Sequence, residues 1–423
     1  MDLELVTVGS ELLLGFTLDT NAAEIARALA SVGARVTTRT TVGDSEPAIR
    51  DAVAGALRRT GLVVVTGGLG PTSDDVTKKA VAGLFDAPLE LDQQYLRRLE
   101  QRFARLGRGP MPPSNRTQAE FPRGATVLPN RRGTAPALWL DGAPGTAVLL
   151  PGVPHEMRAL LREELIPRVR SLVEARHETP VTTRWRTLRT TGTTESAIAS
   201  ALADLEAGLA PVTVAYLPGF SGVDLRLMVS GLREPEADAA LHRAAERVLP
   251  VLDAHYYGEG DTDLAMVVLD QLRARRMRLA VAESCTGGLI GARITAIPGS
   301  SEVFAGGVVS YADDSKVRDL EVPGSLLEAH GAVSEPVVRA MMAGAARRFG
   351  VEASVAVTGI AGPAGGSEGK PVGTVWLAAR AGGRDRAVLR RFPGGREAVR
   401  QRSAQAALDL LRRLLSGVRA ERR

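Results

Sequence analysis

Two hydrophobic periods alternate along the first 170 residues of the chain. Short apolar runs typical of buried strands are followed by segments whose apolar residues recur every three or four positions, as in helices that cover a core. The pattern predicts strands at 3–8, 35–42, 62–66, 125–129, 136–140 and 147–150, and helices at 20–32, 46–60, 75–85, 92–107 and 154–175. This alternation predicts a parallel or mixed sheet between two layers of helices.

The pattern changes in residues 173–255 and then returns to α/β alternation. The middle part predicts a small α+β module, with strands at 181–190, 212–217 and 223–230 and helices at 194–206 and 234–249. Further on, it predicts helices at 261–275, 334–349 and 395–416 and strands at 277–282, 305–311, 353–358, 372–379 and 386–392. We therefore expect an α/β protein of three domains, at 1–172, 173–255 and 256–423.

One turn of the middle module has a sequence known from nucleic-acid binding. Gly219-Phe220-Ser221-Gly222 matches the GxxG loop of RNA-binding KH domains. In KH domains that loop joins two helices, whereas two predicted strands flank it here. We therefore expect a hairpin turn within a KH-like module.

Composition narrows the class of protein. The chain has 423 residues, more than a single core usually holds, and its 44% hydrophobic and 24% charged residues are ordinary for a globular protein. No apolar run approaches the roughly 18 residues of a membrane span, and no basic residue precedes the first apolar segment. Cys285 is the lone cysteine, which excludes an internal disulfide and suits a reducing compartment. We expect a cytoplasmic protein with no membrane partner.

The charge balance argues against a nucleic-acid partner. The 53 basic and 48 acidic residues are largely interspersed, which favours a mixed-charge surface over a basic stripe. Nearly all the basic residues are arginines, and the only lysines are Lys78, Lys79, Lys316 and Lys370. Because a desolvated lysine can lose its proton and an arginine cannot, a retained lysine is a candidate for proton chemistry, with chance survival as the alternative.

The segment LAVAESCTGGLIG, residues 279–291, predicts a strand, a tight turn and a helix. Such a turn lies at the carboxyl edge of an open α/β sheet, where ligands bind. Ser284 can attack a carbonyl there while amides at the helix start hold the oxyanion. Two alternatives remain, a phosphate-binding loop without a nucleophile, and Cys285 as an activated thiolate.

The segment LVVVTGGLGPTSDD, residues 62–75, has the same design. Gly67, Gly68 and Gly70 follow a buried strand, and their amides suit a phosphate or pyrophosphate. Asp74 and Asp75 are expected at the helix start, where they can bind a divalent cation or simply cap the helix. We expect residues 9–13, Asp19 and Asn21 to join this cleft. Since the pattern is neither Walker A nor GxGxxG, an ATPase or dinucleotide oxidoreductase is not expected.

Several blocks of the first domain resemble the CinA family of competence/damage-inducible proteins. They are GSELLLGFTLDTNA (9–22), TGGLGPTSDDVT (66–77), NRTQAEFPRGA (115–125) and LPGVPHEM (150–157). The resemblance implies a three-layer domain similar to molybdopterin-binding proteins of the MoaB/MogA type. It also implies metal-dependent hydrolysis of ADP-ribose to AMP and ribose 5-phosphate, with Gly67, Gly68, Gly70, Asp74 and Asp75 as the phosphate and metal region. The alternative is a domain that binds molybdopterin or a nucleotide without turnover.

Four segments of the last domain are expected to converge at one sheet edge. They are AESCTGG (282–288), GGVVSYADDSK (306–316), VTGIAGPAGG (357–366) and FPGGREAVR (392–400). Together they resemble PncC, the nicotinamide-nucleotide amidase domain that forms the second half of CinA proteins. The resemblance covers residues 260–415 and implies cofactor-free hydrolysis of nicotinamide mononucleotide to nicotinate mononucleotide and ammonia.

The residues of this domain limit which base can assist the nucleophile. His330 is its only histidine and lies at a predicted helix end, so a Ser-His-Asp triad is poorly supported, and Lys316 is the alternative base. The resemblance assigns Ser284 as nucleophile, Lys316 as base and Tyr311 as a proton relay. It further assigns substrate binding to Thr358, which would orient the substrate, Arg396, which would hold its phosphate or nicotinamide end, and Glu283, Thr286, Gly287, Gly288 and Gly359.

Each role has a structural alternative. Tyr311 can be a packing residue at a strand end, Lys316 a solvated helix residue, Arg396 a surface residue and Glu283 half of a salt bridge. The resemblance also implies a homodimer. The name of the family suggests a third hypothesis, that the protein is a partner in competence or DNA recombination. Such a role would require a basic stripe, which the sequence lacks.

Overall fold

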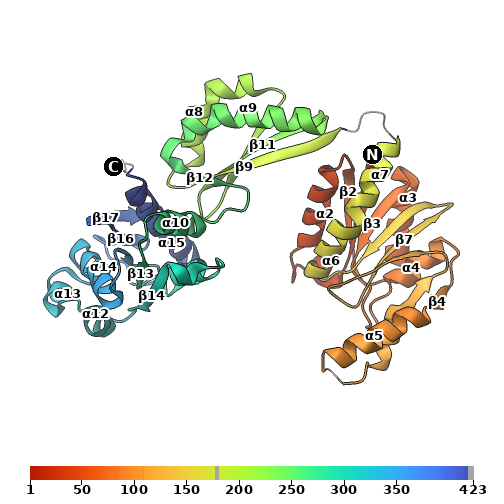
Figure 1. Cartoon of the computed structure of the whole chain (residues 1–423), viewed down its shortest axis with the longest axis horizontal. Coiled ribbons are helices and arrows are strands. Elements are labelled where there is room, and N and C mark those ends of the chain that lie inside the picture. The colour runs from red at the N-terminus through yellow and green to blue at the C-terminus, as the bar shows by residue number, and fades with distance from the viewer. Residues whose placement is uncertain (108, 177–180, 418–423) are drawn as a thin grey trace. The chain divides into compact units, whose positions relative to one another are not determined.

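The structure, a computed structural model, describes residues 1–107, 109–176 and 181–417, and the chain forms two compact units. The first unit comprises residues 1–184 with 230–238, and the second comprises 185–229 with 239–423. Figure 1 shows the chain and labels most of its longer elements. The division at residues 172 and 255 stays a prediction.

A six-stranded sheet forms the centre of the first unit. Its order is β2-β1-β3-β8-β7-β6, with β1 (Asp2–Val8), β2 (Arg35–Val42), β3 (Leu62–Thr66), β6 (Thr126–Leu128), β7 (Ala137–Gly142) and β8 (Gly145–Leu150). The first four strands of this order are parallel to one another, whereas β7 runs antiparallel to both of its neighbours, β8 and β6. A separate pair, β4 (Leu89–Leu91) and β5 (Glu120–Pro122), escaped the sequence pattern because each strand is three residues long.

Helices cover both faces of this sheet, as the alternation of periods predicts. They are α1 (Ser10–Leu13), α2 (Thr20–Ala30), α3 (Glu46–Thr60), α4 (Thr77–Leu84), α5 (Gln93–Arg105), α6 (Pro154–Leu160) and α7 (Ile166–Arg176). Leu3 and Leu5 of β1 pack with α2, α6 and α7, whereas Val6 and Val8 pack with α3 and α4. Side chains of alternate strand residues therefore serve two cores, one for each helical layer.

The middle module is a four-stranded antiparallel sheet with two helices. Its sheet order is β10-β11-β9-β12, with β9 (Thr182–Thr190), β10 (Thr213–Pro218), β11 (Val223–Leu232) and β12 (Tyr256–Glu259), and its helices are α8 (Glu195–Glu206) and α9 (Glu234–Leu252). Pro218 pairs with Val223, and the Gly219 amide donates to the Gly222 carbonyl at 2.8 Å. The expected hairpin turn is confirmed.

The carboxyl-terminal domain has a five-stranded sheet in the order β14-β13-β15-β16-β17. Its strands are β13 (Leu279–Glu283), β14 (Phe304–Val309), β15 (Ala353–Gly359), β16 (Thr374–Ala381) and β17 (Arg384–Arg391), of which β14, β13 and β15 are parallel. Its helices are α10 (Leu264–Ala274), α11 (Leu289–Thr295), α12 (Asp313–Leu320), α13 (Gly324–His330), α14 (Glu335–Phe349) and α15 (Arg396–Ser416).

Two cores flank this sheet as well. Residues of α10, α11 and α15 fill one face, and α14 with the ends of α12 and α13 fills the other. The sequence pattern did not predict α12, because it is short and charge-rich and buries few apolar residues. None of the helices in the described ranges is long and apolar enough to cross a membrane.

Candidate active site

The carboxyl ends of β13, β14 and β15 meet at one edge of the last sheet. Ser284 follows β13, and its amide donates to the Val357 carbonyl of β15 at 3.0 Å. The Ser310 amide, just after β14, donates to the Glu283 carbonyl at 2.8 Å. Arg396, which begins α15, donates to the Gly362 carbonyl at 2.9 Å. The predicted convergence of four segments is therefore confirmed.

Among the residues that the structure describes, Glu283 forms no salt bridge, and it is not a free polarising group. Its buried carboxylate accepts the amides of Gly288 at 3.0 Å, Ile290 at 3.1 Å and Gly291 at 2.8 Å. The first turn of α11 is thus satisfied by the strand residue before it, as a helix N-terminus prefers. The expectation that these helix amides hold an oxyanion is wrong, because a carboxylate already occupies them.

The amides that remain for an oxyanion lie earlier in the turn. The Gly287 amide donates to the Ser284 carbonyl at 3.0 Å, whereas those of Cys285 and Thr286 donate to no oxygen among the described residues. Gly287 and Gly288 have φ of 62° and 92°, which favour glycine and bend the chain sharply into α11. The glycines therefore shape the turn that presents Ser284.

Ser284 and Cys285 face different surroundings. Ser284 is 8% exposed, and its hydroxyl makes no hydrogen bond within the described part of the chain. Cys285 packs into the apolar core, and burial raises the pKa of its thiol to about 12, with Glu283 adding to the rise and Arg396 and Lys316 opposing it. The thiolate alternative is thereby disfavoured, because the buried group stays protonated.

Lys316 lies on the helix after the neighbouring strand and is 1% exposed. Its ammonium donates to the Tyr311 carbonyl at 3.3 Å and to the Asp313 carboxylate at 3.1 Å. The alternative of a solvated helix residue is therefore wrong. Its charge is close enough to affect the pKa of Cys285, the residue next to Ser284, so the two proposed groups share one edge of the sheet.

Tyr311 and Arg396 form a pair of their own. The strand predicted at 305–311 ends at Val309, and the Tyr311 side chain is 56% exposed, so it is no strand-end packing residue. Its hydroxyl accepts from Arg396 at 2.5 Å, whereas Lys316 reaches its backbone carbonyl. Arg396 is the donor to this hydroxyl, and Lys316 makes no bond to it within the described residues, so the relay role stays a prediction.

Two residues expected to bind substrate are occupied elsewhere. The Thr358 hydroxyl, at the end of β15, donates to the Ala332 carbonyl at 2.9 Å. It can therefore orient a ligand only as an acceptor. A β-carbon on Gly359 would lie 2.7 Å from the side chain of Val375. Packing within the sheet therefore explains Gly359.

Ser310, Arg400 and Asp313 are residues that the motifs did not single out, whereas the resemblance assigned Thr286 to substrate binding. The buried hydroxyls of Thr286 and Ser310 have no hydrogen-bond partner among the described residues. Arg400, one turn after Arg396, donates to the Thr286 carbonyl at 3.1 Å. Asp313 lies three residues before Lys316 on α12, a helix that the sequence pattern did not predict.

The glycine loop of the first unit follows β3 as predicted. Gly67 has φ of 108°, and a β-carbon there would lie 2.2 Å from the Val8 carbonyl oxygen. A β-carbon on Gly68 would meet the Thr77 hydroxyl, and one on Gly70 would meet the Asp75 carboxylate. These glycines let the loop pass close to β1 and fold back against its own residues.

Asp74 and Asp75 lie in a turn rather than at a helix start. Helix α4 begins at Thr77, with Val76 as an N-cap that offers no side-chain bond, so the capping alternative is wrong. The Asp75 carboxylate accepts the Thr72 amide at 2.8 Å and the Thr72 hydroxyl. Within the described residues, no group of three histidines, cysteines or acids is placed to hold a metal. A cation here would need phosphate oxygens or water as further ligands.

A cavity of about 120 Å³ lies at the carboxyl ends of β1 and β3. Glu11, Asp19, Asn21 and Gly67 line it, which confirms that those segments join the Gly67 loop, but Gly68, Gly70, Asp74 and Asp75 are not part of its lining. Asp19 caps α2 through the Ala22 amide, and the Asn21 amide donates to the Gly152 carbonyl at 2.7 Å. The buried Asn21 side-chain oxygen has no partner in the described ranges.

The sequence matches three family models along its length. Residues 4–171 match a probable molybdopterin binding domain, residues 185–258 the damage-inducible protein CinA KH domain, and residues 261–415 the CinA C-terminal domain. The fold is accordingly a molybdopterin-binding-like domain, a KH-like module and a CinA C-terminal domain.

Relatives match over almost the whole chain. A CinA-like protein of Gemmatimonas aurantiaca is 50% identical over 414 residues, 98% of this chain and 96% of the relative. A CinA-like protein of Parasynechococcus marenigrum is 44% identical, covering 97% of this chain and 98% of the relative. A solved CinA superfamily protein from Klebsiella pneumoniae is 37% identical over 36% of this chain and 96% of its own, with a TM-score of 0.36. The chain belongs to the CinA family.

Proposed function

We propose that the carboxyl-terminal domain hydrolyses the carboxamide of nicotinamide mononucleotide, giving nicotinate mononucleotide and ammonia. The observation that carries this proposal is the fully buried Lys316 beside the strand that presents the unpaired Ser284 hydroxyl. Arg396, exposed at the same edge, has donors left for a phosphate after its bonds to Tyr311 and Gly362.

The chemistry follows from these positions. The Ser284 oxygen attacks the carboxamide carbon while the Lys316 side chain, as the base, takes its proton. The amides of Cys285 and Thr286 hold the oxyanion. The carbon–nitrogen bond then breaks, the proton passes from Lys316 to the leaving group, and ammonia departs. Water attacks the resulting ester and regenerates Ser284. Asp313 and the Tyr311 carbonyl stabilise the transient ammonium of Lys316.

Ammonia release from three substrates tests the proposal. Nicotinamide mononucleotide, nicotinamide riboside and nicotinamide share the carboxamide, but only the first carries phosphate. We expect turnover of the mononucleotide, a kcat/KM at least tenfold lower for the riboside, and loss of at least 100-fold in kcat in Lys316→Met. Lys79→Met, on an exposed lysine paired with Glu46, is the matched control. Equal rates of ammonia release for Lys316→Met and Lys79→Met would show that Lys316 is not the base.

We further propose that the first domain hydrolyses ADP-ribose to AMP and ribose 5-phosphate with the help of a divalent cation. The cavity lined by Glu11, Asp19, Asn21 and Gly67 supports it, because amides of the loop suit phosphate and carboxylates suit a hard cation. Asp74, which the resemblance places in the metal region, lies exposed in the turn after Gly70 and outside that lining. The bound cation would supply charge neutralisation at the phosphorus that water attacks.

Phosphate release through a coupled phosphatase distinguishes hydrolysis from mere binding. ADP-ribose with Mg²⁺ should yield phosphate, while EDTA, Glu11→Gln and Asp74→Asn should lower the rate. Glu90→Gln, on the exposed strand β4, is the control. Binding of ADP-ribose without any phosphate release would favour the alternative of a molybdopterin- or nucleotide-binding domain that does not turn over.

A further inference from the structure

The second unit contains another cavity, of about 680 Å³, whose lining includes none of the residues assigned to the amidase. Its walls are the hairpin turn Pro218–Val223 and the Thr191–Thr194 loop on one side, and β16, β17 and α15 on the other. A volume of this size falls in the range of about 300–1,000 Å³ that small-molecule sites occupy.

Gln405 of α15 faces this cavity with an unsatisfied amide. The residue is 3% exposed, and neither its side-chain oxygen nor its nitrogen has a hydrogen-bond partner within the described residues. A buried polar group left unpaired is destabilising, so such groups are rare and need an explanation. A ligand that offers a donor and an acceptor side by side would satisfy both ends of the amide.

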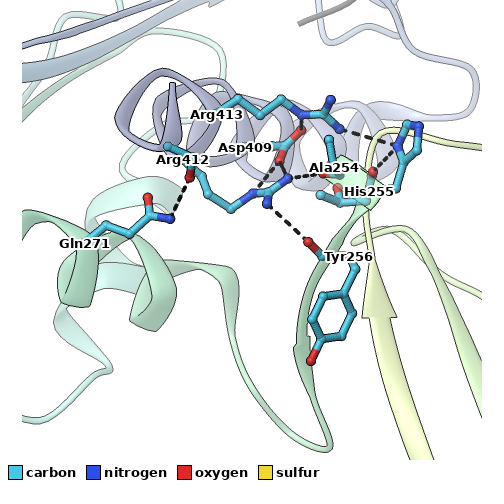
Figure 2. A network of polar contacts seen from close by, with 9 residues as sticks. Ala254, His255, Tyr256, Gln271, Asp409, Arg412 and Arg413 are labelled. Carbon is cyan, nitrogen blue, oxygen red and sulfur yellow. Dashed lines mark hydrogen bonds and ion pairs between the residues drawn. The ribbon is translucent and has the colours of Figure 1, made fainter. Parts of the chain in front are cut away.

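The cavity is positively charged. Arg390, Arg402 and Arg413 line it, and Asp409 is the one acid among its described lining residues. Asp409 is already neutralised, since its carboxylate accepts Arg412 and Arg413, each at 2.7 Å (Figure 2).

Arg390 shows the effect of this excess of charge. Its pKa is lowered from the usual value by burial and then by the neighbouring charges of Arg386 and Arg413. An anion in the cavity would offset this repulsion, and a phosphate matches the planar donors of a guanidinium.

The same cavity has an aromatic and apolar part. Phe220, at the tip of the hairpin, is 53% exposed, and the Arg402 guanidinium carbon lies 5.7 Å from its ring centre. Leu377, Val388 and Phe392 supply apolar wall. A flat heteroaromatic ring can stack on such a surface while its polar edge turns to an amide.

We propose that this cavity binds a purine mononucleotide, with the phosphate on the arginines, the base against the apolar wall and Phe220, and the base edge on the Gln405 amide. A glutamine amide pairs with the adjacent donor and acceptor of adenine, so AMP is the first probe. A single nucleotide fits better than an RNA strand, because the GxxG turn joins two strands here and not the two helices of an RNA-binding KH domain.

Calorimetric titration of the full-length protein with AMP tests the proposal. Gln405→Leu, Phe220→Ala and Arg402→Met should each weaken one class of AMP sites at least tenfold, while adenosine and ribose 5-phosphate alone bind at least tenfold more weakly than AMP. Arg380→Met, on an exposed arginine of β16, is the control and should stay within about twofold of the parent protein.

Photolabelling with 8-azido-AMP identifies the site independently of either proposed activity. After trypsin, label is expected on the peptide 190–226, which contains Phe220, and Gln405→Leu should abolish it. Three outcomes overturn the proposal: label confined to residues 1–184 or 279–320, unchanged AMP affinity in all three variants, and binding of a ten-nucleotide oligoadenylate without binding of AMP.

Discussion

The Arg396 guanidinium lies 2.5 Å from the Tyr311 hydroxyl, joining the start of α15 to the loop after β14. Because Arg396 already donates to this hydroxyl, we expect the hydroxyl to position substrate rather than to relay a proton. Tyr311→Phe should lower kcat for nicotinamide mononucleotide by less than about tenfold, whereas loss of proton transfer costs about 100-fold or more. Steady-state ammonia release measures kcat, and a loss of 100-fold or more in Tyr311→Phe would show that the hydroxyl relays a proton.

Arg396 should act mainly on substrate binding. A charge-assisted hydrogen bond contributes about 1.5–3 kcal/mol, so Arg396→Met is expected to raise KM roughly tenfold to 100-fold with a smaller change in kcat. Comparison with Tyr311→Phe separates the effect of the Arg396 charge on KM from that of the Tyr311 hydroxyl. An unchanged KM would show that the phosphate is held elsewhere.

Cys285 should be unreactive in the native protein. Because burial raises the pKa of its thiol to about 12, the thiol stays protonated at pH 8. Iodoacetamide should therefore label the single cysteine at least 100-fold more slowly in buffer than in 6 M guanidinium chloride. Rapid labelling of the folded protein would revive the thiolate alternative.

Glu283 should stabilise the start of α11. Glu283→Gln keeps the size of the side chain but replaces one of the two oxygens that accept the amides of Gly288, Ile290 and Gly291. A loss of about 1–3 kcal/mol corresponds to exchange of these amides about 5-fold to 150-fold faster. Hydrogen exchange read by mass spectrometry reports it, with Glu328→Gln on the exposed face of α13 as control. Unchanged protection in Glu283→Gln would contradict the capping role.

Lys78 should make the first unit more stable as pH rises above 8. Burial lowers the pKa of its amine from 10.5 to about 8, although Glu120 and Asp75 oppose the shift. Between these two values the unfolded chain holds a proton that the folded chain has released, so the free energy of unfolding increases with pH, by about 3 kcal/mol in full. Below pH 8 this contribution is absent.

Urea unfolding at pH 8 and at pH 10 measures the effect. In a chain with Trp185→Phe and Trp376→Phe, the fluorescence of Trp139 reports the first unit alone. Lys78→Met should remove most of the rise that the parent chain shows, whereas Lys79→Met should retain it. The same pH slope in both lysine variants would show that Lys78 is not the group responsible.

The sequence predicted the sheets better than the short connecting elements. Runs such as Leu62–Thr66 and Leu279–Glu283 are buried on both faces, so continuous apolar residues identified them as strands before any contact was known. Helix α12 could not be predicted in the same way, because its charged residues show no apolar stripe and its burial depends on Lys316 and Leu320.

The candidate site was predicted in outline but not in its contacts. The segments that carry Ser284 and Lys316 were expected at one sheet edge, and they lie there because β13 and β14 are parallel neighbours. The sequence did not predict that the Glu283 carboxylate would accept the amides of α11 or that Arg396 would donate to the Tyr311 hydroxyl. Those bonds depend on side-chain directions across three elements, which periodicity does not contain.

Two neighbouring variants test directly whether Ser284 is the nucleophile. Initial rates of ammonia release from nicotinamide mononucleotide should fall at least 1,000-fold in Ser284→Ala and stay within about threefold of the parent chain in Cys285→Ala. Loss of turnover in Cys285→Ala with turnover preserved in Ser284→Ala would contradict the account.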